Sequence, residues 1–128
     1  MASILFATHD PGPARLIAAL IEPARLRGHS VSLMGDGPAL AVWRSMGEPV
    51  IETDANAPAL PALLPDIIVT GTGSTELERN LWHDGAEQKI PVIGLLESWV
   101  NVSTRFFRNQ VDIQPMAWVF STLIYVTR

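Results

Sequence analysis

The sequence predicts an α/β fold in which helices cover both faces of a mostly parallel sheet of five or six strands. Short apolar runs of strand length alternate with amphipathic segments of helix length along the 128 residues. The connections between most of these segments are short turns that contain glycine, proline or aspartate. This alternation indicates a single three-layer α/β/α domain, and a chain of this length has room for one core.

Composition excludes several classes of protein. Hydrophobic residues make up 48% of the chain and charged residues 17%, which is typical of a folded domain with a buried core. The net charge of −4 and the single lysine argue against a nucleic-acid surface. The absence of cysteine removes disulfides, thiol catalysis and the usual zinc sites, and is compatible with the cytoplasm, where we expect the protein. We expect no metal, no cofactor and no signal peptide. We also expect no membrane span, because the apolar run at 117–126 is far shorter than the roughly 20 residues of a spanning helix.

The first half of the chain predicts two strand–helix units and a third strand. The expected elements are strands at 3–8, 29–34 and 50–52 and helices at 13–27 and 39–46. The sheet-facing side of the first helix is predicted from apolar residues at helical spacing, namely Leu16, Ile17, Leu20, Ile21 and Ala24. Pro23 predicts a kink or a break one or two residues before it, because proline removes a helical hydrogen bond. Gly28 predicts a left-handed helix end, and Pro38 suits the first position of the second helix.

The second half predicts further strands at 67–70, 91–96 and 118–126. Thr75 and Glu78 form a capping box, which opens a helix that runs to about Gln88. Between the two halves, residues 55–65 hold three prolines, so we expect an irregular connection there, either mobile or packed on the surface by its leucines.

Polar turns at one edge of the sheet are the candidate site. The carboxyl ends of parallel strands point the same way, so we expect four turns to meet there: 9–12, 35–37, 71–75 and 97–101. His9 is the candidate general acid or base, because its ordinary pKa lies near neutrality. Asp10 should point away from it, so a carboxylate from another turn, such as Glu97, is expected to orient the imidazole. The alternative is that His9 and Asp10 only bond the turn and cap the helix.

The remaining candidates are ligand-binding groups at the same edge. The small-residue turn can bring backbone N–H groups close to a phosphate or another anion, and it comprises Gly71, Thr72, Gly73, Ser74 and Thr75. The alternative is a tight turn before a well-capped helix. Gly12 is the corresponding glycine of the first turn. Trp99 could stack on a ring or belong to the core, and His29 and His83 are interpreted as structural or solvated.

Two long runs resemble a known class of enzyme. ILFATHDPGPARLIAALIEPARLRGHSVSLMGDGPA resembles the N-terminal, Rossmann-like half of GT-B-fold sugar-nucleotide enzymes, and PDIIVTGTGSTELERNLWHDGAEQKIPVIGLLESW resembles the later part of that half. The resemblance includes UDP-N-acetylglucosamine 2-epimerase-like proteins and transferases of polysaccharide biosynthesis. It implies an acceptor-side domain with a sugar or sugar-nucleotide ligand, in which His9 matches a loop histidine that acts as base or acceptor contact. Gly12 matches the loop glycine, and Glu97 the acidic residue after the fifth strand.

The resemblance also sets an expectation about catalysis. GT-B enzymes bind the donor mainly in a C-terminal domain, which this sequence does not include, so we expect the chain to need a longer protein or a separate partner for transfer. The apolar strand at its end would expose an edge, which predicts truncation or a homodimer. A non-catalytic receiver-like or small-ligand-binding regulatory domain is the alternative, with Asp10, Asp54 and Thr70 after successive strands. A dinucleotide-binding domain lacks its glycine spacing here.

Overall fold

The computed structural model of the chain describes residues 1–53, 60, 64–73 and 75–95 in full, and the backbone of residue 96. Beyond residue 96 it describes four short strand segments. The first half contains β1 (Ser3–Thr8), α1 (Pro11–Leu26), β2 (Ser30–Gly35), α2 (Pro38–Ser45) and β3 (Ile51–Glu52). The second half contains β4 (Ile67–Thr70), α3 (Glu76–Gln88), β5 (Val92–Leu96), β6 (Phe107–Arg108), β7 (Val111–Asp112), β8 (Ala117–Phe120) and β9 (Leu123–Val126).

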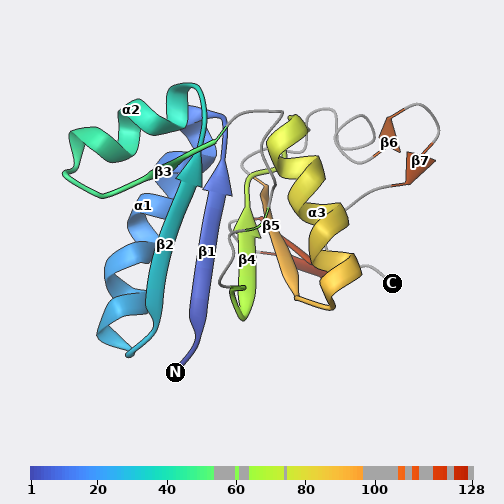
Figure 1. The fold of residues 1–128 in the computed structure, drawn as a ribbon, viewed down its shortest axis with the longest axis horizontal. Coiled ribbons are helices and arrows are strands. Elements are labelled where there is room, and N and C mark those ends of the chain that lie inside the picture. Colours follow the sequence, from blue (N-terminus) through green and yellow to red (C-terminus); the bar gives the residue numbers. More distant parts are fainter. Residues whose placement is uncertain are drawn as a thin grey trace.

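One sheet of seven strands organises the molecule, in the order β3-β2-β1-β4-β5-β8-β9. Six of the strands run parallel, and β9 pairs antiparallel with β8 at one edge. β2, β1, β4 and β5 lie side by side, with α3 against one face (Figure 1). The mostly parallel α/β sheet predicted from the sequence is confirmed, and its order is that of a Rossmann-like fold.

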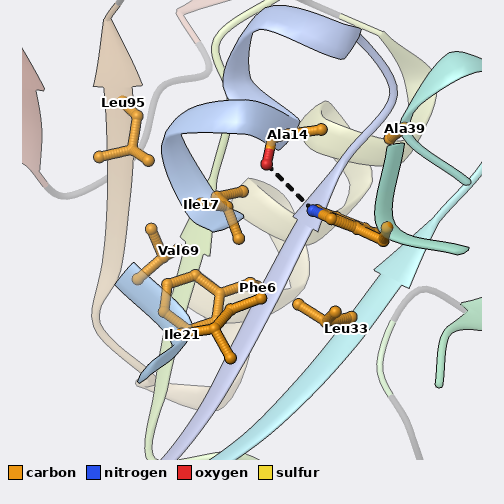
Figure 2. Packing of buried hydrophobic residues seen from close by; sticks show 9 residues of the cluster. Phe6, Ala14, Ile17, Ile21, Leu33, Ala39, Val69 and Leu95 are labelled. Atoms are coloured by element: carbon orange, nitrogen blue, oxygen red, sulfur yellow. Dashed lines mark hydrogen bonds between the residues drawn. The ribbon is translucent and has the colours of Figure 1, made fainter. Parts of the chain in front are cut away.

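Two hydrophobic clusters on opposite faces of the sheet make the three layers. Consecutive strand residues point to opposite faces, so Phe6 packs under α1 and α2 while Leu5 and Ala7 pack under α3. Figure 2 shows the first cluster, in which side chains of α1 such as Ile17 lie over the sheet. Trp43 of α2 is fully buried there and donates its indole N–H to the carbonyl oxygen of Ala14, 3.0 Å away, which is the dashed line in Figure 2. This bond joins α2 to α1.

The first helix differs from its prediction in two respects. It runs without a break through Pro23 from Pro11, two residues before the predicted start. Both Pro23 and Ala19, whose carbonyl loses its helical partner, are exposed, so water can bond that carbonyl. The buried stripe also differs, because Leu16 and Leu20 are about two-fifths exposed and the sheet-facing residues are Pro13, Ala14, Ile17 and Ile21.

The other elements follow their predictions closely, except near the end of the chain. Gly28 and Gly47 end α1 and α2 with positive φ values of 85° and 76°. The predicted strand at 118–126 is two antiparallel strands, β8 and β9, and the short pair β6–β7 was not predicted. Most of the connection at 55–65 lies outside the described residues. In the part of the chain that is described, no helix has both the length and the apolar character that crossing a bilayer requires.

Candidate active site at the carboxyl edge of the sheet

The candidate site lies where the strand order of the sheet reverses. β1 is flanked by β2 on one side and by β4 on the other, and all three run parallel. In open parallel sheets, ligands bind outside the carboxyl ends of the strands at such a reversal. The turns that follow β1, β2 and β4 therefore surround the place where a ligand is expected, here called the crevice, and three of the four predicted turns come from these strands.

His9 and Asp36 form a hydrogen-bonded pair at this edge. Thr8 pairs with Gly35 in the sheet register, so the next residue of each strand lies beside the other. The imidazole Nδ1 of His9 lies 2.7 Å from a carboxylate oxygen of Asp36. The side chains are 36% and 28% exposed, which leaves both within reach of a ligand. The partner carboxylate thus comes from the second turn, while the predicted partner Glu97 lies outside the described residues.

The backbone around this pair fixes the imidazole. Gly37 has a φ of 58°, and a β-carbon there would clash with the ring of His9. The N–H of Ala39 donates to the carbonyl oxygen of His9 over 3.0 Å. When Nδ1 carries the proton and donates to Asp36, Nε2 is left as an acceptor. The geometry therefore suits a general base.

Asp10 points away from His9, as predicted, and lies against the turn after β4. A β-carbon on Gly73 would overlap the Asp10 carboxylate and would come within 3.3 Å of an oxygen of Glu78. Glycine at position 73 therefore allows both carboxyl groups to approach the same stretch of backbone.

Glu78 is the most unusual side chain of this edge. It is fully buried on α3, and its Oε2 accepts hydrogen bonds from the Thr8 hydroxyl at 3.3 Å and from the Gly73 N–H at 3.4 Å. The Thr75 hydroxyl donates to Oε1 over 2.9 Å. Burial raises the pKa of the Glu78 carboxyl to about 7, and the charge of Asp10 adds to that effect, while the hydrogen bonds from Thr75 and Gly73 oppose it.

The turn after β4 is packed too tightly for a side chain at position 71. A β-carbon on Gly71 would meet the Glu78 carboxyl, the Thr8 hydroxyl and Pro13. Thr72 is buried, and its hydroxyl donates to the carbonyl oxygen of Leu95 in β5 over 3.0 Å. These contacts hold the turn against the ends of β1 and β5.

Most of the other predicted site residues lie in the turns at this edge or outside the described residues. Gly12 lies in the first turn of α1, and Thr75 is the N-cap of α3, with its hydroxyl accepting from the Glu78 N–H at 3.4 Å. Ser74, Glu97 and Trp99 lie outside the described residues. The roles of two residues were not predicted from the sequence. Asp36 stands between two glycines at a predicted strand end, and Glu78 was interpreted only as a capping residue.

Among the described residues, one group has the composition of a metal site: His83, Asp84 and Glu87. These side chains lie in the second half of α3, beyond the crevice turns, and pair with one another at 3.4 Å and 3.7 Å. No protein-family model matches the chain, and no curated protein matches it.

Proposed function

We propose that the chain is the acceptor-side domain of a sugar-nucleotide-dependent glycosyltransferase or epimerase-like protein. The observation that carries the proposal is the 2.7 Å contact between His9 and Asp36, whose side chains are partly exposed at the carboxyl edge of a Rossmann-like sheet. A carboxylate-oriented imidazole at such an edge is suited to accept a proton from a hydroxyl group. The cytoplasmic location expected from the sequence stays a prediction.

The proposed chemistry assigns a role to each residue. Nε2 of His9 accepts the proton of an acceptor hydroxyl, and the oxygen then forms a bond to the anomeric carbon of the donor sugar. The bond from that carbon to the nucleotide breaks, and the nucleotide leaves with the electron pair. Asp36 is a positioning residue that holds the imidazole. The donor would be bound by a second domain facing this crevice, in the same protein or in a partner.

Two other classes of function have less support. Receiver domains have a 2-1-3-4-5 strand order, whereas here β3 lies beside β2 and β1 pairs with β4. For a dinucleotide-binding domain, Asp36 stands after the second strand, where a ribose-binding carboxylate is found. Here that carboxylate is bonded to His9, and Pro11 and Pro13 flank Gly12 where the dinucleotide motif has its glycines.

Binding of sugars by the purified chain tests the proposal. A panel of neutral saccharides and of UDP-, GDP- and CDP-sugars is added, and the melting temperature is followed, because a ligand of the folded state raises it. We expect a saccharide to raise it. We also expect His9→Ala to weaken that binding about tenfold, as loss of one hydrogen bond to the ligand would.

The matched control is His83→Ala, which removes the other histidine that is paired with carboxylates, on the exposed face of α3. It should leave binding unchanged. If no saccharide binds, or if His9→Ala binds as well as the wild-type chain, the proposal is wrong.

A further inference from the structure

We infer that the crevice between the ends of β1, β2 and β4 takes a neutral, hydroxyl-bearing ligand and excludes phosphate. This inference rests on the proposed function for the assignment of the crevice as an acceptor site, and it specifies the chemical class of that acceptor. Its basis is the way in which the three helices that begin at this edge use their own N-terminal N–H groups.

Phosphate usually binds at this edge of a Rossmann-like sheet because helix N-termini offer unpaired N–H groups. In α1 two of the first three residues are prolines, Pro11 and Pro13, which have no N–H. The next N–H, that of Ala14, donates to the carbonyl oxygen of Asp10. Only Gly12 contributes an N–H in the first three positions of this helix, so α1 makes a poor phosphate cradle.

The N-terminal N–H groups of the second helix are also unavailable to a ligand. Its first residue is Pro38, and the N–H of Ala39 donates to the carbonyl oxygen of His9 at 3.0 Å. The N–H of Leu40 donates to the carbonyl oxygen of Gly37 at 3.2 Å. The first three residues of α2 therefore offer no N–H group to a ligand.

At α3 the place of an anion is taken by a side chain of the protein. The Glu78 carboxyl accepts the N–H groups of Gly73 and Thr75, and the N–H of Glu78 donates to the Thr75 hydroxyl. The turn at 71–75 was predicted to bind an anion through these donors. The side chains of Glu78 and Thr75 use them inside the fold.

The charges of the three turns act in the same direction. The described residues in 8–14, 35–39 and 70–78 include no lysine or arginine and four carboxyl groups: Asp10, Asp36, Glu76 and Glu78. The next residues along α1 and α3 are the exposed Arg15 and the buried Arg79. A phosphate dianion would be repelled by these groups, whereas sugar hydroxyls can donate to carboxylates and to His9 Nε2. The turns thus offer acceptors, which fit a neutral polyol.

The test compares inorganic phosphate with neutral sugars by NMR at about pH 8, where Glu78 is ionised. Each neutral sugar is paired with its phosphorylated form, such as glucose with glucose 6-phosphate. Wild-type chain should show no saturable shift of the Gly12, Gly71 and Gly73 amides with phosphate. The neutral sugar of a binding pair should bind at least about tenfold more tightly than its phosphorylated form.

Variants that remove one charge each test the cause. Glu78→Gln keeps the shape of the side chain, and Asp10→Asn keeps that of the neighbouring carboxylate. Each should give phosphate-dependent shifts of the three glycine amides at concentrations where the wild-type chain gives none, because one repulsive charge is lost. Glu22→Gln, at an exposed position in the last two turns of α1, is the control and should change nothing.

The outcomes separate this inference from the proposed function. Saturable phosphate binding to wild-type chain at the three glycine amides would overturn the inference and leave the acceptor role standing. Absence of phosphate-dependent amide shifts in both charge-removing variants would also overturn it. A failure of all saccharides to bind would instead contradict the proposed function, while the phosphate titrations would still decide whether the crevice excludes anions.

Discussion

At the scale of single residues, the buried carboxyl of Glu78 makes stability depend on pH. Its pKa is about 7 in the folded chain, above its ordinary value of 4.5, because burial and Asp10 disfavour the charged form. Between these two values the folded state holds a proton that the unfolded state has lost. Stability from this group is therefore complete below about pH 4.5 and falls as the pH rises to about 7.

We predict that Glu78→Gln removes this pH dependence. The wild-type free energy of unfolding should fall by about 3 kcal/mol between pH 4.5 and 7, and the variant should lose far less. Urea unfolding at a series of pH values measures both curves. Parallel curves would show that Glu78 does not hold a proton in the folded chain.

A second carboxylate provides the control, because its effect lies in another pH range. The hydrogen bond from Arg25, at 2.9 Å, lowers the pKa of Glu48 below its ordinary value of 4.5. Its stabilising effect is present above that value and is lost as the pH falls below it. Glu48→Gln should alter only this acid limb of the curve and leave the fall toward pH 7 intact.

At the scale of elements, α1 carries a proline where a helix former would serve better. We predict that Pro23→Ala raises the free energy of unfolding by about 1–3 kcal/mol, because alanine restores the bond to the Ala19 carbonyl and has the higher helix propensity. Chemical denaturation measures the gain. Pro38→Ala, at the first position of α2, is the matched control and should be close to neutral. Equal effects of the two substitutions would contradict the explanation.

The same helix shows what the sequence could predict and what it could not. The spacing of Ile17 and Ile21 correctly predicted a helix with one buried face. The apolar residues at helical spacing also include Leu20, which lies beyond the part of the helix that the sheet covers. A proline rule that considers only the lost bond predicts a break at Pro23. Whether water can replace the bond depends on which side of the helix faces solvent, and that is settled by tertiary packing.

At the scale of the whole molecule, the two hydrophobic clusters share the strands of one sheet. Phe6 and Val69 belong to one face, and Leu5 and Ile68 belong to the other. We predict that both faces unfold in a single transition, so that Ile17→Ala and Leu81→Ala each lower stability by about 2–5 kcal/mol and shift the whole curve. Circular dichroism and tryptophan fluorescence should give coincident curves in both variants. Separate transitions would contradict the prediction.

The sheet could be predicted from the sequence more fully than the site. Alternating apolar runs and punctuating glycines carry the strand and helix positions, because local periodicity reflects burial. The location of the candidate site could also be predicted, because the carboxyl ends of parallel strands lie at the same edge of the sheet. The pairing of His9 with Asp36 required the register of β1 against β2, which is a contact between residues distant in the chain. The burial of Glu78 could not be predicted, because it depends on how closely the backbone at Gly71 and Gly73 packs against its carboxyl group. No rule of residue spacing gives that distance.

The close contact between Gly73 and Asp10 couples the sizes of the side chains that the two loops can carry at these positions. Any larger side chain at position 73 must displace the Asp10 carboxylate, because the space for its β-carbon is already filled. A shorter side chain at position 10 would leave room for that β-carbon. Redesign of this crevice therefore has to vary positions 10 and 73 together, and a library that varies either one alone will mostly sample clashes.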